Sequence, residues 1–207
     1  MEETVVPIVD WGVAALALAG EKRSGDEYIV KAWGKKFLAA VIDGLGHGEP
    51  AADVARIAAE FLIRHAADSD DVVSLVRQCH ESLLRTRGVV LSLALFDAMN
   101  NAMTWLGVGN VVGLLLRTDP QSNPASESLF LRGGVAGYQL PSLRPATIPV
   151  GRGDVLVLAT DGIHSGFERE VGIEESPQQI ADMIIRNYNR KTDDALVFVA
   201  RYIGGSS

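Results

Sequence analysis

Four aspartates lie where a short apolar run of the sequence meets a glycine or another acidic residue: Asp26, Asp43, Asp161 and Asp193. Asp43 follows the run 37–42 and precedes a glycine, and Asp161 follows the run 155–160 in the same way. Apolar runs of this length are typical of buried strands. We therefore expect the four carboxylates at the rim of a core, where their mutual repulsion favours protonation or a bound hard cation.

The length and charge of the chain narrow the classes of protein that it can represent. With 207 residues it can bury about 70% of the surface that its unfolded form exposes, so we expect one domain spanning 1–207. A net charge of −7 argues against nucleic-acid binding, which needs a basic surface. The longest apolar stretches, such as 111–116, fall short of the roughly 20 residues of a membrane helix. We therefore expect neither a nucleic-acid nor a membrane partner.

The single cysteine and the N-terminal sequence indicate the cellular compartment in which the protein is expected to be found. Cys79 has no second cysteine with which to form an internal disulfide. The acidic segment 1–4 lacks the charged and apolar regions of a signal peptide. A cytoplasmic protein is the expectation.

Strand-like runs outnumber helical ones along the chain. Short apolar runs predict strands at 13–19, 28–33, 37–42, 89–96, 103–108, 111–116, 128–131, 155–159 and 196–202. Apolar residues at helical spacing predict helices over 50–62, 72–83 and 176–188. Because the helices are clustered in blocks, the pattern predicts an α+β layered domain, not a doubly wound sheet. The turn-rich segment 118–126 predicts a surface hairpin loop.

Four short segments carry a family resemblance: Asp-Gly-Leu-Gly-His-Gly at 43–48, Gly-Asp-Glu-Tyr at 25–28, Ala-Thr-Asp-Gly at 159–162, and Thr-Asp-Asp-Ala with the apolar run after it at 192–201. Together they resemble the metal-dependent Ser/Thr protein phosphatases of type 2C (PPM), in particular the bacterial branch of sporulation and stress-response regulators. Each segment is weak alone, but the set spans nearly the whole chain. The resemblance implies a four-layer αββα sandwich, two packed antiparallel sheets flanked by helices, with a dinuclear Mn²⁺ or Mg²⁺ site at one edge.

The resemblance also implies roles for the residues of this site. Asp43 would bridge both ions, and the carbonyl of Gly44 would bind one of them. Asp161 and Asp193 would bind the other ion, and Asp26 would act directly or through water. Hard oxygen ligands suit Mg²⁺ or Mn²⁺ better than Zn²⁺. A water between the ions would attack the phosphorus atom of phosphoserine or phosphothreonine.

The role of the histidine and the choice between two adjacent aspartates as metal ligand are not decided by the sequence. In the eukaryotic phosphatases a histidine directly follows the Asp-Gly pair, whereas here that position is Leu45 and the histidine is His47. His47 either protonates the leaving oxygen or packs in a glycine turn. Asp194 could replace Asp193 as the ligand, since adjacent strand residues face opposite sides. We choose Asp193, because the bacterial family uses the first acid of the pair.

Three other readings compete with this one. The stretch from Cys79 to Arg85 has the cysteine-to-arginine spacing of thiolate phosphatases, but it lacks glycine and continues an apolar helix face, so we expect Cys79 in the core. A histidine-kinase-type ATPase would need a helix where 27–42 indicates strands. A catalytically inactive PPM-like signalling scaffold remains the third reading.

Nearly the whole chain is used by the expected catalytic domain, which leaves no room for a sensor. Within the branch, the chain most resembles the single-domain feedback phosphatases of the stressosome. The resemblance implies phosphorylated stressosome scaffold or co-antagonist proteins as substrates, with a phosphorylated anti-sigma-factor antagonist as the alternative. We expect the protein to act as a monomer.

Overall fold

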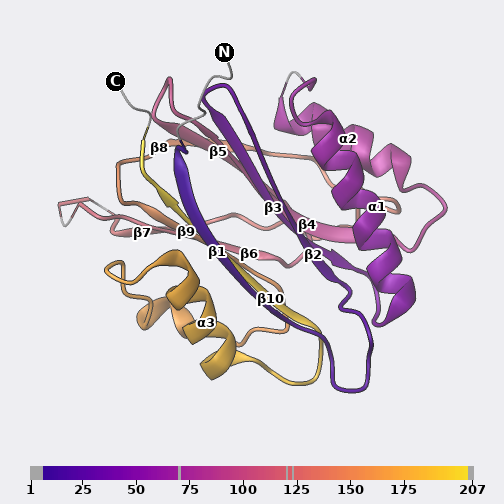
Figure 1. Cartoon of the computed structure of the whole chain (residues 1–207). Helices are drawn as coiled ribbons and strands as arrows, with labels where there is room; N and C mark the ends of the chain where they lie inside the picture. The colour runs from indigo at the N-terminus through magenta and orange to yellow at the C-terminus, as the bar shows by residue number, and fades with distance from the viewer. Residues whose placement is uncertain (1–6, 70, 120, 123, 205–207) are drawn as a thin grey trace, which may run out of the picture.

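Two five-stranded antiparallel sheets form the centre of the molecule in a computed structural model, which describes residues 7–69, 71–119, 121–122 and 124–204 (Figure 1). The first sheet has the spatial order β1 (Val9–Leu16), β10 (Ala195–Tyr202), β9 (Val155–Ala159), β6 (Val112–Leu116) and β7 (Ser126–Ser128). The second has the order β2 (Asp26–Trp33), β3 (Lys36–Gly44), β4 (Val89–Asp97), β5 (Ala102–Val108) and β8 (Ala146–Pro149).

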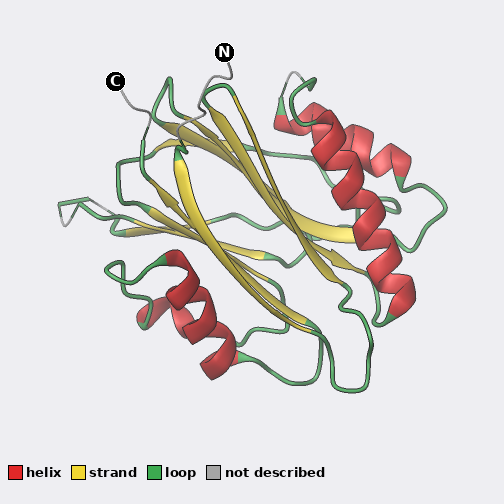
Figure 2. Ribbon diagram, in the orientation of Figure 1, coloured by secondary structure: helices red, strands yellow, loops and turns green. Residues whose placement is uncertain are grey.

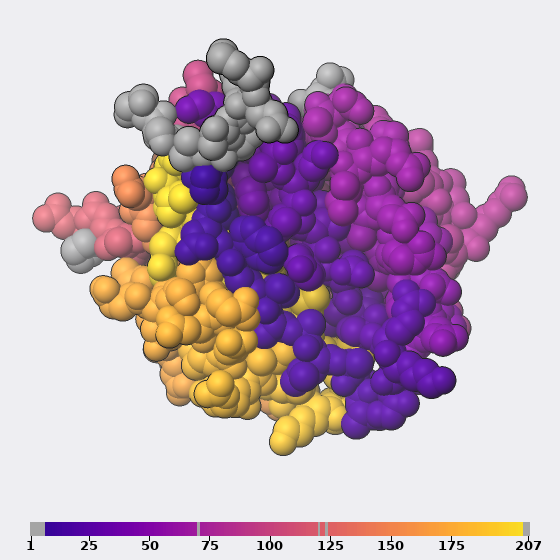
Figure 3. All heavy atoms as spheres, in the orientation of Figure 1, coloured from indigo at the N-terminus to yellow at the C-terminus, as the bar shows by residue number. Residues whose placement is uncertain are grey.

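Helices cover the outer face of each sheet, as Figure 2 shows. The helices α1 (Glu49–His65) and α2 (Val72–Ser82) pack on the second sheet, and α3 (Pro177–Tyr188) packs on β1 and β10 of the first. A short 3₁₀ helix, η1 (Phe167–Arg169), precedes α3. The expected four-layer αββα sandwich is confirmed. Figure 3 shows the N-terminal strands, in indigo, on the face between the two helical layers.

Both faces of β3 are buried, which explains its unbroken apolar sequence. Leu38, Ala40 and Ile42 pack toward α1 and α2, whereas the alternate residues Phe37, Ala39 and Val41 pack between the sheets. Strand residues alternate between faces, so a strand in an inner layer needs apolar side chains at every position. The inner strand β10, between β1 and β9, follows the same rule. The acidic residues at the ends of these strands are therefore fixed by a core on both sides.

The predicted elements differ from the observed ones mainly at the sheet edges. The predicted hairpin over 118–126 is confirmed, because β6 and β7 are antiparallel neighbours; positions 120 and 123 lie outside the described residues. The run 128–131 is not a strand, since the chain leaves β7 at Ser128 and Leu129 enters the core. Edge strand β8 was not predicted, because only four mostly exposed residues form it and one is a proline.

Helix α3 begins one residue after the predicted start at 176, and a complete capping box forms there. The Ser176 hydroxyl accepts from the Gln179 backbone N–H, and the Gln179 side chain accepts from the Ser176 backbone N–H. Pro177 at the first helical position loses no hydrogen bond there.

Among the described residues, no helix combines the length and the apolarity needed to cross a membrane.

Cys79 is fully buried on α2, as expected for a core residue. Burial raises the pKa of its thiol to about 12, so the reactive thiolate is suppressed at neutral pH. We expect Cys79→Ala to leave kcat per folded molecule unchanged, while the melting temperature falls because a core atom is lost. Kinetics on an aryl phosphate with parallel thermal melts checks this. Loss of turnover in a variant that is still folded would point instead to thiolate chemistry.

Candidate metal centre

The pairing of the strands brings the predicted acids to one end of the sandwich. Asp26 at the start of β2 lies directly opposite Asp43 near the end of β3. Residues directly opposite in an antiparallel pair have Cβ atoms about 4.5–5.5 Å apart on the same face. Asp161 follows β9, and Asp193 precedes its neighbour β10. Residues far apart in the sequence thus meet at this edge.

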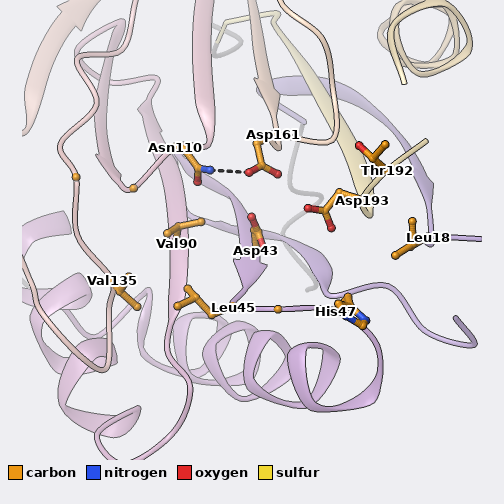
Figure 4. Close-up of a pocket in the computed structure, with 13 residues that line it drawn as sticks. Leu18, Asp43, Leu45, His47, Val90, Asn110, Val135, Asp161, Thr192 and Asp193 are labelled. Atoms are coloured by element: carbon orange, nitrogen blue, oxygen red, sulfur yellow. Dashed lines mark hydrogen bonds between the residues drawn. The ribbon is translucent and has the colours of Figure 1, made fainter. Parts of the chain in front are cut away.

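An open cavity of about 530 Å³ lies at this end, and three of the four acids face it. In Figure 4 the carboxylates of Asp43, Asp161 and Asp193 point toward a common centre. The cavity is lined by Leu18, Asp43, Leu45, Gly46, His47, Val90, Gly109, Asn110, Gly133, Val135, Asp161, Thr192 and Asp193. None of these described lining residues is a lysine or an arginine, so the walls carry no permanent positive charge to offset the carboxylates.

Burial and mutual repulsion perturb two of the acids. Burial, followed by the charges of Asp161 and Asp193, raises the pKa of Asp43 to about 7. Burial, followed by the charge of Asp43, raises the pKa of Asp26 to about 8, against the opposing effect of a hydrogen bond from Thr160. A nearby divalent cation would favour the ionised forms. The site is therefore electrostatically suited to bind one.

Asp26 does not line the cavity. It is buried, and its Oδ2 accepts a 2.7 Å hydrogen bond from the Thr160 hydroxyl. The Thr160 oxygen also accepts from the Leu196 backbone N–H at 2.9 Å. Asp26 therefore links the second sheet to the first directly behind Asp161. Sequence reasoning missed Thr160, although it immediately precedes that acid.

Asp193 and Asp194 have different surroundings, although they are adjacent. Asp193 is exposed and faces the cavity. Asp194 is buried, and its two carboxylate oxygens accept from the backbone N–H groups of Leu18 and Gly25, both at 2.7 Å. It holds the connection between β1 and β2 against the site. Of the two acids, only Asp193 has a carboxylate exposed to the cavity.

The two Asp-Gly pairs bring a backbone segment close behind each acid. A Cβ added at Gly44 would overlap the carbonyl oxygen of Ala51 in α1, and one added at Gly162 would overlap the carbonyl oxygen of Asp194. Both positions therefore require glycine on steric grounds. Gly44 itself is buried, and its N–H donates to the Gly25 carbonyl at 3.0 Å.

His47 lies on the glycine-rich loop at the cavity wall, with its ring turned away from the carboxylates (Figure 4). Its side chain is 67% exposed, and Nδ1 donates to Glu21 Oε1 at 2.7 Å. Asn110, between β5 and β6, also reaches the site. Its Nδ2 donates to Asp161 Oδ2 at 2.7 Å and orients that carboxylate.

The spacing of the donors bears on the kind of ion that fits. Within the described ranges, no three Asp, Glu, His or Cys side chains are close enough together to hold one ion by themselves. The acids are nevertheless near enough to raise one another's pKa. Mg²⁺ keeps several of its waters and takes only one or two carboxylates in many protein sites. The open, carboxylate-lined cavity fits a partly hydrated hard cation.

The raised pKa values predict how the stability of the metal-free protein depends on pH. The folded state binds protons at Asp26 and Asp43 more tightly than the unfolded chain, in which the usual value is 3.8. The free energy of unfolding should therefore decrease as the pH rises from about 4 to about 8. Urea denaturation in chelator across this range checks it. Asp26→Asn should flatten the profile; an unchanged slope in that variant would contradict the prediction.

Comparisons with known protein sequences identify relatives of this chain. The sequence profile of Stage II sporulation protein E (SpoIIE) matches residues 34–203. The phosphoserine phosphatase RsbX of Bacillus subtilis (strain 168) is 26% identical over 184 residues, which cover 87% of each chain.

Solved structures share the fold over almost the entire chain. A structure from work on the bacterial stressosome as a modular system that controls secondary messenger signalling has a TM-score of 0.83 and 28% identity, covering 93% of this chain and 99% of that one. A crystal structure of RsbX in complex with magnesium has a TM-score of 0.82 and 21% identity, covering 93% of this chain and 94% of the other. The second likeness, at this identity, shows the fold alone.

Proposed function

The chain belongs to the SpoIIE family and is a protein serine/threonine phosphatase of the PPM type, and from this premise we propose that it dephosphorylates proteins of a stressosome. The observation that supports the chemistry best is the convergence of three carboxylates on one open cavity. The observation that supports the substrate is the similarity to RsbX over 87% of both chains, together with the likeness to a stressosome-related structure.

We propose that Asp43, Asp161 and Asp193 hold divalent cations, with the Gly44 carbonyl and Asp26 as further ligands, Asp26 through water. Bound Mg²⁺ or Mn²⁺ would supply an activated water as nucleophile and would offset the negative charge of the phosphoryl oxygens. Asp26 is the weakest ligand candidate for direct contact, because it is buried behind the cavity and one of its oxygens is engaged by Thr160.

The other polar groups of the site position the acids. Asn110 restrains the Asp161 carboxylate, and Thr160 restrains Asp26. His47 is paired with Glu21, so its side chain would have to leave that carboxylate before it could donate a proton to a leaving serine oxygen. The apolar wall, which includes Leu45 and Val90, can pack against the protein that carries the phosphate.

A direct test of the chemistry uses phosphate release from an aryl phosphate with Mn²⁺, with Mg²⁺ and with excess chelator. We expect turnover with either metal and none with chelator. Full activity in chelator would rule out metal-dependent hydrolysis. Complete inactivity with both metals, in a protein that melts cooperatively, would favour the inactive signalling scaffold.

A second experiment tests the substrate. Purified stressosome scaffold and co-antagonist proteins are phosphorylated by their kinase and incubated with the enzyme and Mn²⁺, in parallel with a phosphorylated anti-sigma-factor antagonist. Mass spectrometry then follows each phosphosite over time. We expect rapid loss of phosphate from the scaffold or co-antagonist. Persistence of those phosphates while the antagonist is cleared would reassign the substrate and leave the phosphatase chemistry intact.

A further inference from the structure

The residues that line the cavity offer no permanent positive charge to a negatively charged substrate. A phosphorylated side chain carries a charge of about −1.5 to −2 at neutral pH. It must approach a site lined by three carboxylates, and the described lining residues include no lysine or arginine. A cation outside the lining but within reach of it would assist binding.

Arg87 meets this description. A Cβ added to Gly46, a lining residue, would lie 2.9 Å from Arg87 Nη1. The guanidinium thus lies against the rim of the cavity, in space that the missing side chain of Gly46 leaves open. Gly46 has a φ of 96°, a conformation that favours glycine and so keeps this space free.

The backbone that carries Arg87 is held firmly between α2 and β4. The Thr86 hydroxyl donates to the Leu83 carbonyl at 2.6 Å and accepts from the Gly88 N–H at 3.1 Å. The Leu45 N–H donates to the Gly88 carbonyl at 3.2 Å, which ties this loop to the glycine-rich loop of the site. Arg87 is therefore a long, exposed side chain on a fixed base beside the cavity.

Two other arginines, Arg23 and Arg132, are already engaged, whereas Arg87 is not. Arg23 pairs with Asp53 at 2.9 Å, and the Arg132 guanidinium lies over the Phe130 ring, 5.1 Å from its centroid. Within the described part of the chain, Arg87 has no ion-pair or hydrogen-bond partner for its side chain. Its guanidinium is available to a ligand.

We propose that Arg87 binds the phosphoryl group of the substrate at the mouth of the metal centre. This assignment rests on the proposed function, since it names the residue that receives the phosphate of that reaction. A guanidinium offers a planar pair of N–H donors that matches two phosphoryl oxygens, which an ammonium group does not.

Binding of inorganic phosphate tests the proposal without relying on turnover. Calorimetric titrations with Mg²⁺ present would compare the wild type with Arg87→Ala, Arg87→Lys and Arg85→Ala, the last being an exposed arginine on the same loop. We expect Arg87→Ala to weaken phosphate binding about tenfold or more. Arg87→Lys should retain part of the affinity and Arg85→Ala nearly all of it.

Kinetics then separate the phosphoryl contact from contacts with the rest of a substrate. Arg87→Ala should raise KM for an aryl phosphate and for phosphopeptides alike. Unchanged phosphate binding in Arg87→Ala, or an effect confined to phosphopeptides with acidic flanks, would overturn the assignment. Arg87-dependent phosphate binding without any hydrolysis by the wild type would refute the proposed function and leave the binding role of Arg87 standing.

Discussion

Replacing Asp43 or Asp161 by asparagine should lower kcat for phosphate hydrolysis by about a thousandfold or more, because each change removes ligand charge from the site that would activate water. Both side chains face the same cavity, and Asp161 contributes to the raised pKa of Asp43. The fold should survive both changes. Asparagine has nearly the same shape as aspartate and relieves repulsion between acids, so the metal-free variants should melt at or above the wild-type temperature.

The measurement is steady-state hydrolysis of an aryl phosphate over a range of Mn²⁺ concentrations, with thermal melts in parallel. Bound metal stabilises the native state by about 2.7 kcal/mol at a hundred times its dissociation constant, so Mn²⁺ should raise the wild-type melting temperature and have less effect on the variants. Asp182→Asn, at an exposed position of α3, is the matched control. Wild-type turnover by both site variants would eliminate the metal mechanism.

The largest effect on stability is expected from alanine at Gly162 or Gly44. At each position the added Cβ would overlap a backbone carbonyl oxygen, that of Asp194 or that of Ala51. Neither oxygen is at the end of a flexible side chain, so a strand end or helix α1 has to move. Overpacking of this kind costs about 1–3 kcal/mol and sometimes more. We expect a lower denaturation midpoint and, because an adjacent acid is displaced, weaker metal binding.

Gly172→Ala provides the control for this experiment. A Cβ there meets nothing within 4 Å, and the residue does not have a positive φ. Its free energy of unfolding should be within about a few tenths of a kcal/mol of the wild type or slightly higher, because alanine restricts the unfolded chain. If Gly162→Ala and Gly44→Ala were as stable as Gly172→Ala, the close packing behind the acids would not matter for folding.

The inner strands and the acids at their ends were predictable because local sequence determines them. The run 37–42 is apolar on both faces of β3, and such a run has few alternatives to a buried strand. The position of Asp43 at its end then follows from chain order. The convergence of Asp26, Asp43 and Asp161 on one edge is seen in the structure, whereas their assignment as metal ligands stays a prediction.

Other features of the site depend on contacts between segments that are distant in the sequence. The residues next to them in the sequence therefore give no indication of these contacts. Nothing near Asn110 indicates that its amide reaches Asp161, since the preceding Gly109, with its positive φ, explains a turn equally well. The role of Asp194 in holding Leu18 and Gly25 likewise appears only in three dimensions. Arg87 reaches the cavity through its proximity to Gly46, which is forty-one positions earlier in the printed sequence.

The position of β10 between β1 and β9 has a consequence for biosynthesis. β1 pairs with no described strand except β10, with Val9 opposite Tyr202. While the ribosome makes the chain, β1 must therefore remain unpaired until β10 emerges. Asp193, just before that strand, reaches the cavity only then. A nascent chain that still lacks β10 thus cannot assemble the complete acidic site, and enzyme activity can begin only after β10 has been made.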